Sequence, residues 1–319
     1  MQALPNDLTH LILSRVNCAS IRLISDDQFP GNWKSPAINE IYKRKRLFVQ
    51  IYVSPKEGQS RLRISTVLEG EDLRENVHLH ELDSEFPTKP ISQLCISDHD
   101  RSCEILNLWP VIKFILPDSS WAHVDLKRDF RVLDHIFNAG CHEIIVDVIK
   151  AANLGIVRDI CDRLSREKIP KLDGFYIAFS TTVASDFQFP MKIIDNHDLK
   201  HLYISLPEPD THKWPVQEHS EEMWSHVKKF LSGKDQEFLG IAFPNPPPSA
   251  LKDVLDEWEK RPENFENFTW RLFWFEVVER STIFPCQEGE EMNYVRSHLK
   301  DPRAKAIYAF GNLIKFKYE

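Results

Sequence analysis

Apolar and polar residues alternate between residues 199 and 206, near the middle of the chain. The apolar positions there are Leu202, Ile204 and Leu206, and a period of two residues is typical of a half-buried β-strand. Similar apolar runs occur at residues 144–149, 172–179, 238–243 and 269–275. The five runs start roughly thirty residues apart, which is the spacing of repeated strand-plus-helix units.

Between these runs the apolar residues fall at helical spacing. The stretch 220–232 predicts one helix, whose inward residues would be Met223, Val227, Phe230 and Leu231. The stretch 249–261 predicts another helix that ends before Pro262. A strand-plus-helix unit cannot bury its apolar face alone, so we expect neighbouring units to stack into one curved sheet. The two-residue turn signal Gly311-Asn312 predicts a closing hairpin that covers the last edge of this sheet.

Residues before 119 follow two other patterns. Apolar residues at helical spacing between 4 and 16, and again between 35 and 46, predict short helices. Residues 47–53 and 62–67 predict paired strands around a turn at 55–58. We therefore expect an α/β fold class, with a helical segment at 1–46, a small β-rich segment at 47–118 and an α/β domain at 119–319.

Composition and charge restrict the partners and the compartment. The 319 residues are 42% hydrophobic and 28% charged, as in globular proteins, and the formal net charge of −8 argues against a nucleic-acid partner. The N-terminus has no signal-peptide pattern and the sequence has no apolar run of membrane-spanning length, so we expect no membrane partner and a cytoplasmic protein. The basic run at 43–46 makes the nucleus an alternative, although such a run also fits a solvated helix end.

Candidate catalytic and metal-binding residues are sparse. Residues 78–81 and 98–100 contain histidines and carboxylates that could ligate a metal, but without a fixed ligand spacing they are interpreted as polar loops. Cys141 beside His142 could form a nucleophile and base, yet its place before a strand favours a buried thiol. The six cysteines form no C-x-x-C pair, so reduced thiols are expected. We expect no enzyme activity, no cofactor and no metal.

The N-terminal segment resembles an F-box. The residues that carry this resemblance are Leu4, Pro5, Leu8, Ile12, Leu13, Val16, the segment 21–23 and Trp33. Together with the basic run, the early strands, the Ser-Ser-Trp stretch at 119–121, the strand–helix units and the closing hairpin, the layout is similar to a large nematode family of F-box-like proteins. The resemblance implies that an F-box-like helical segment and a small β-rich segment precede irregular leucine-rich-repeat-like units.

The same resemblance implies a function. F-box proteins are substrate receptors of cullin-based, SCF-type ubiquitin ligases, so the expected partners are a Skp-type adaptor protein and an unidentified protein substrate. The adaptor-binding residues would be Leu4, Pro5, Leu8, Ile12 and Val16. The alternative is a repeat-type interaction scaffold with no ligase role, in which this apolar stripe packs into the protein's own core.

The expected substrate surface is the sheet face opposite the helices. Such a face is left to solvent in strand–helix repeats, and at 201–205 it would carry His201 and Tyr203. Tyr176, from the preceding unit, is expected to share that face. Tyrosine and histidine combine contact area with hydrogen bonding, so Tyr176, His201 and Tyr203 are the predicted substrate-binding residues. The alternative is that the two tyrosines pack beneath loops.

Overall fold

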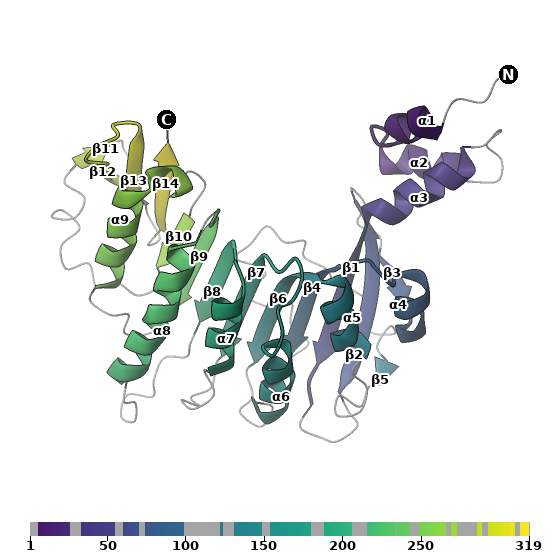
Figure 1. The fold of residues 1–319 in the computed structure, drawn as a ribbon, viewed down its shortest axis with the longest axis horizontal. Coiled ribbons are helices and arrows are strands. Elements are labelled where there is room, and N and C mark those ends of the chain that lie inside the picture. The colour runs from purple at the N-terminus through teal and green to yellow at the C-terminus, as the bar shows by residue number, and fades with distance from the viewer. Residues whose placement is uncertain are drawn as a thin grey trace.

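Figure 1 shows the computed structural model of the chain. The structure describes residues 6–25, 33–54, 60–69, 74–98, 122–123, 131–148, 154–179, 188–205, 216–233, 235–242, 249–265, 269–272, 286–288, 293–309 and 313–318. The described strands form one 14-stranded sheet, and the described helices pack along it or at its N-terminal end (Figure 1). The prediction of an α/β fold is therefore confirmed.

Three short helices form a separate bundle at the N-terminal end. They are α1 (Asn6–Leu13), α2 (Cys18–Ser25) and α3 (Lys34–Arg44). Leu13, Ile21 and Ala37 are buried between them, with Trp33 and Val16 packed against this small core. Figure 1 shows the bundle standing beyond the end of the sheet, to which α3 connects directly. We call α1–α3 the helical unit.

The centre of the sheet is parallel. Its strands, in spatial order, are β1 (Lys45–Tyr52), β4 (Ile91–Ser97), β6 (Cys141–Val148), β7 (Gly174–Phe179), β8 (His201–Ser205), β9 (Phe238–Ala242) and β10 (Thr269–Leu272). Each of the predicted strands near 144, 172, 199, 238 and 269 is present. Because β4 pairs with β6, the sheet is continuous across the predicted division at residues 118 and 119.

Antiparallel strands extend both ends of this parallel centre. Beyond β1 lie β2 (Arg61–Leu68), β3 (Arg74–Val77) and β5 (Ala122–His123). Beyond β10 lie β14 (Leu313–Tyr318), β13 (Ala304–Ala309), β12 (Asn293–Ser297) and β11 (Cys286–Glu288). The predicted hairpin is formed by β13 and β14. It does not close the sheet, because β12 and β11 continue the sheet past it.

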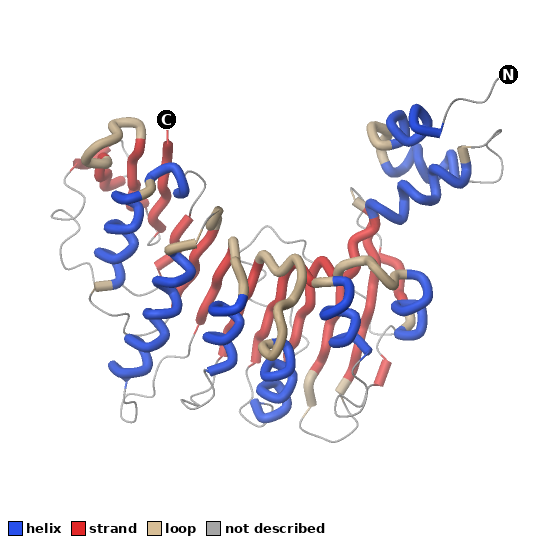
Figure 2. The backbone as a smooth tube through the Cα atoms, in the orientation of Figure 1, coloured by secondary structure: helices blue, strands red, loops and turns tan. Residues whose placement is uncertain are grey.

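Helices cover one face of the sheet, as Figures 1 and 2 show. They are α4 (Leu79–Glu85), α5 (Arg131–Ala139), α6 (Leu154–Leu164), α7 (Gln188–Asn196), α8 (Val216–Leu231) and α9 (Ala250–Lys260), followed by the 3-10 helix η4 (Pro262–Phe265). The predicted inward residues of the eighth helix, Met223, Val227, Phe230 and Leu231, are all buried. No helix in the described ranges is long and apolar enough to cross a membrane.

A ladder of apolar residues joins the strands to these helices. Leu94, Ile144, Phe175, Leu202 and Leu239 stand in register across β4, β6, β7, β8 and β9, and none of them is exposed. Burying each such side chain stabilises the fold by about 1.5–3 kcal/mol. The alternation seen in the sequence thus marks the helix-covered face.

Glycine at position 240 leaves room for an aromatic ring. A Cβ atom added there would lie 2.3 Å from Cδ2 of Tyr203, whose ring covers this part of β9. We therefore expect Gly240→Ala to lower the free energy of unfolding by about 1–3 kcal/mol, the usual cost of overpacking. Thermal and urea unfolding measure this difference in the free energy of unfolding between the variant and the wild type. Gly155→Ala is the matched control, because the added methyl group meets nothing within 4 Å in α6. Equal stability of the two variants would contradict the close approach of Tyr203.

Candidate functional site

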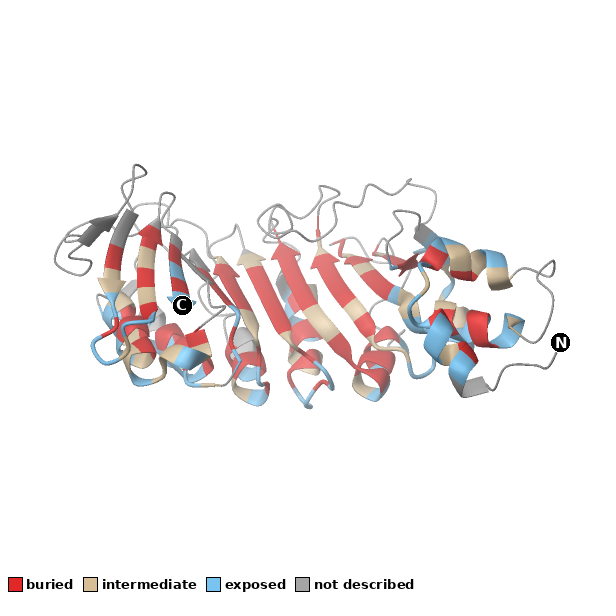
Figure 3. Ribbon diagram, turned by 90° about the horizontal axis from the view of Figure 1, so that it is seen from above, coloured by how far each residue is buried: buried red, intermediate tan, exposed pale blue. Residues whose placement is uncertain are grey.

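Exposed apolar side chains concentrate on the helical unit. Among the described residues, the large exposed ones are Leu8, Leu11, Ile12, Leu23, Ile38 and Leu299. All but Leu299 belong to α1, α2 or α3. Leu8, Leu11 and Ile12 are neighbours on one face of α1, because positions three and four apart meet on the surface of a helix. Figure 3 shows exposed residues on these helices, in contrast with the buried strands.

The predicted adaptor-binding residues separate into three groups. Leu4 and Pro5 lie outside the described residues. Leu8 and Ile12 are 45% and 42% exposed, so this part of the predicted face points to solvent and not into the body of the protein. Val16 differs, because it follows the end of α1 and packs against the internal core of the helical unit. The exposed surface on α1 consists of Leu8, Ile12 and Leu11, and the sequence pattern does not distinguish them from Val16.

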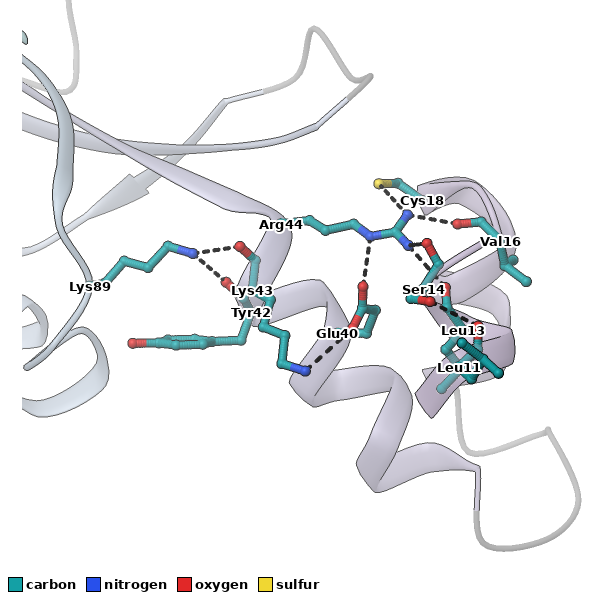
Figure 4. Close-up of polar contacts among 10 residues, drawn as sticks. All are labelled: Leu11, Leu13, Ser14, Val16, Cys18, Glu40, Tyr42, Lys43, Arg44 and Lys89. Carbon is teal, nitrogen blue, oxygen red and sulfur yellow. Dashed lines mark hydrogen bonds and ion pairs between the residues drawn. The ribbon is translucent and has the colours of Figure 1, made fainter. Parts of the chain in front are cut away.

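Arg44 holds the helical unit together (Figure 4). Helix α1 ends at Leu13, so the carbonyl groups of its last turn have no partner within the helix. The Arg44 guanidinium donates hydrogen bonds to the carbonyl oxygens of Leu13 at 2.9 Å, Ser14 at 2.8 Å and Val16 at 2.6 Å. Its Nε donates to Glu40 at 3.0 Å, so a carboxylate on α3 balances the charge.

Two further contacts fasten the helical unit to the sheet. Lys89, just before β4, donates to the carbonyl oxygens of Tyr42 at 2.9 Å and Lys43 at 2.7 Å, which lie in the last turn of α3 (Figure 4). Glu75 on β3 pairs with Lys45 and with Arg22 of α2. The basic run at 43–46 is therefore not a uniformly solvated helix end, because Arg44 and Lys45 are engaged inside the protein.

The sheet face opposite the helices was expected to be open to solvent, but its two tyrosines are buried. Tyr176 and Tyr203 stand in register on this face, which confirms that they share it, but they are only 3% and 5% exposed. They form a buried cluster with Cys95, Ile145 and Phe238. The expected exposure of the two tyrosines is therefore wrong: their rings pack into this cluster and come close to glycines, where no side chain stands in the way. Tyr176 covers Gly174, and Tyr203 covers Gly240.

A groove opens at the amino ends of the parallel strands. It has a volume of about 640 Å³ and lies where the end of α3 meets the sheet. Its walls carry Lys43, Arg44, Lys45, Arg46, Phe48, Glu69, Lys89, Pro90, Ser92, Gln93, His142, Glu143, Asp173, Lys200, His201 and Glu237. His201 is thus the one predicted substrate-binding residue that reaches this opening, and its side chain is 15% exposed. We call this the amino-end groove.

Charged residues of the groove are mostly paired with each other. His142 Nδ1 lies 3.0 Å from Asp173 Oδ2, and His201 Nε2 lies 3.1 Å from Glu237 Oε2. The Gln93 amide donates to Glu143 at 2.9 Å. These residues come from five different strands or from the turns just before them, so sequence spacing does not bring them together. They become neighbours only because the parallel strands lie side by side in register.

The candidate catalytic pair is not assembled. Cys141 is fully buried, and burial raises the pKa of its thiol to about 12. The thiol donates to the carbonyl oxygen of Glu143 at 3.2 Å, while His142 pairs with Asp173. A thiol with so high a pKa is a poor nucleophile at neutral pH.

The candidate metal ligands are also dispersed. Within the described residues no group of three or more histidine, cysteine or carboxylate side chains could hold a metal ion. His78 and His80 stack on each other, with ring centroids 5.6 Å apart, and His78 belongs to the N-terminal capping box of α4. His99 and Asp100 lie outside the described residues.

The chain matches no protein-family model, no curated protein and no solved structure. The exposed apolar surface of the helical unit and the amino-end groove are the two features of the molecule that bear on its function.

Replacement of Arg44 tests whether this residue organises the helical unit. Arg44→Met keeps the side-chain length but removes the hydrogen bonds to the three carbonyl oxygens and the close pairing with Glu40. Each hydrogen bond to a charged group contributes about 1.5–3 kcal/mol, so we expect much faster amide hydrogen exchange across α1 and α2. Arg46→Met is the control, because its pairing with Glu69 is long at 3.8 Å and exposed. Unchanged exchange in Arg44→Met would show that another contact holds the helices.

Glu75 makes the attachment of the helical unit sensitive to acid. The hydrogen bond from Lys45 is the main reason that the pKa of the Glu75 carboxyl lies below its ordinary value. A lowered pKa in the folded state contributes stability above the unfolded value, about 4.3, and this contribution is lost as the pH falls through the folded value. We expect the difference in stability between the wild type and Glu75→Gln to shrink as the pH is lowered from 6. A difference that stays constant in urea unfolding would contradict this.

Proposed function

We propose that the chain is an F-box-like substrate receptor of an SCF-type ubiquitin ligase. The helical unit would bind a Skp-type adaptor, and the sheet region would bind a protein substrate. The observation that carries the proposal is the exposure of Leu8, Leu11 and Ile12 on a helical unit that stands away from the sheet. A cytoplasmic or nuclear location is part of this proposal.

The exposed apolar area on α1 and the low cost of ordering it favour a binding partner at Leu8, Leu11 and Ile12. An exposed apolar patch rimmed by polar residues often marks a site of protein–protein interaction. Leu8 and Ile12 are held on α1 by the Arg44 network, so a partner would meet an ordered helix. Binding then costs little conformational entropy, because these backbone positions are fixed beforehand.

The order of the elements supports a leucine-rich-repeat-like arrangement of the sheet region. From β6 to β10, each strand is followed by a helix and then by the neighbouring parallel strand. The helices cover one face throughout (Figure 2). We propose that these units correspond to the irregular repeats of the nematode F-box-like family, and that the region serves as the substrate-holding part.

A repeat-type scaffold without a ligase role is the second candidate. It is favoured by Val16, which belongs to the predicted N-terminal stripe and yet packs inside the helical unit, next to the buried Leu13. In that case α1–α3 would be a cap on the end of the sheet, and its exposed leucines would bind no adaptor.

Binding of a purified Skp-type adaptor separates the two functions. We expect the double variant Leu8→Ser/Ile12→Ser to bind about tenfold or more weakly, because burying each side chain contributes about 1.5–3 kcal/mol and 1.4 kcal/mol is tenfold in affinity. Calorimetric titration measures this. Both residues are exposed, so the melting temperature should be nearly unchanged.

Leu299→Ser is the matched control for this experiment. Leu299 is 82% exposed, but it follows β12 at the opposite end of the sheet. We expect this variant to bind the adaptor like the wild type. If the wild type itself does not bind, the ligase role is lost and the scaffold remains. If the double variant binds as tightly as the wild type, the adaptor does not use α1.

A further inference from the structure

The amino-end groove carries most of its positive charge at one side and most of its negative charge at the other, with Lys200 and Glu69 as the exceptions. Five of its lysines and arginines lie at the β1 side, on the last residues of α3, on β1 and before β4: Lys43, Arg44, Lys45, Arg46 and Lys89. Three of its four carboxylates lie at the β9 side, on β6 and just before β7 and β9: Glu143, Asp173 and Glu237. The groove is thus a dipolar channel that runs across the strands.

We propose that this groove binds an extended peptide that carries an acidic residue and a basic residue several positions apart. The acidic residue would lie at Lys43 and Arg46, and the basic residue at Asp173 and Glu237. The inference rests on the proposed function in one respect, since the peptide would belong to the protein substrate. The amino-end groove is a different surface from the exposed apolar surface of α1 at Leu8 and Ile12.

The four charged groups named here are accessible, and Lys43 and Arg46 are only loosely paired. Asp173 and Glu237 each lie close to one histidine ring, His142 at 3.0 Å and His201 at 3.1 Å, and remain open to solvent on their other side. The four side chains are 41–63% exposed. Lys43 lies 3.7 Å from Glu40, Arg46 lies 3.8 Å from Glu69, and Lys200 lies 4.0 Å from Glu237. Exposed pairs of this kind contribute only about 0–1 kcal/mol, so a ligand can replace them at small cost. Arg44 and Lys89, in contrast, are committed to backbone carbonyls of the protein.

The geometry of the sheet sets the spacing of the two ligand charges. Phe48 of β1, Gln93, Glu143, Gly174, His201 and Phe238 of β9 stand in register in a row across the groove. Adjacent strands are about 4.8 Å apart, so β7 is about 14 Å and β9 about 24 Å from β1. An extended peptide advances about 3.3 Å per residue, which places the two charges about four to seven residues apart.

A peptide suits this groove better than other charged polymers. A phosphate backbone would meet Glu143, Asp173 and Glu237 along half of the channel, and these carboxylates would repel it. A volume of about 640 Å³ is within the range of specific ligand sites, about 300–1,000 Å³. Phe48 and Pro90 supply an apolar stretch of wall on the basic side.

Synthetic peptides of equal composition test the spacing. One fluorescent peptide has two glutamates and two arginines separated by Ser-Gly-Ser-Gly, and its partner has the four charged residues adjacent, with the same spacer residues at the ends. Both are made in both chain directions. In fluorescence anisotropy at low salt, we expect at least fivefold tighter binding of a separated peptide in one direction. Equal binding of separated and adjacent peptides would overturn the proposal.

Variants of the acidic side locate the binding. We expect Glu237→Lys to remove the preference for separated charges, and Glu237→Gln to reduce it. Asp198→Lys is the control, because it makes the same charge change at a side chain that is 99% exposed and outside the groove. Unaltered preference in Glu237→Lys, with unchanged melting, would overturn the site. Adaptor binding is measured on the same preparations, so loss of the peptide site and loss of the ligase role are distinguished.

Discussion

The contacts of the Arg44 guanidinium organise the helical unit at the N-terminal end of this protein. Helix α1 ends at Leu13, and the guanidinium bonds three carbonyl oxygens at and just after this end, those of Leu13, Ser14 and Val16. A planar cation with several donors can bond all of them at once, whereas a lysine presents a single donor atom. Arg44 is also the last residue of α3, and β1 begins at the next residue, Lys45. The side chain that binds the end of α1 therefore stands at the junction between the helical unit and the sheet.

Both candidate surfaces depend on this junction. The exposed apolar face of α1 is fixed by Arg44 on one side, and the basic half of the amino-end groove is built from residues next to Arg44 on the other. Lys89 and Glu75 then bind the helical unit to the sheet from two directions. The exposed apolar surface of α1 and the charged groove are thus held by the same small set of polar contacts.

Predictions from periodicity succeeded where one physical effect dominates. Burial against the helices selects aliphatic residues at every second position, so Leu202 and Ile204 were recognised as strand residues and lie in the core. The predictions from periodicity failed on the opposite face of the sheet, where residues expected to be exposed are buried. Tyr176 and Tyr203 are polar enough to suit solvent, but they are buried in an apolar cluster, and glycines at 174 and 240 leave room for their large rings.

The sequence by itself determined the α/β class, the main strands, the inward stripe of the eighth helix and the apolar character of α1, because these depend on local spacing. Tertiary structure alone decided which leucines remain exposed, how Arg44 is used and where the groove lies. Exposure is set by the elements that pack nearby, as the contrast between Ile12 and Val16 shows. The groove unites residues from Lys43 to Glu237, and only the lateral register of parallel strands makes them neighbours.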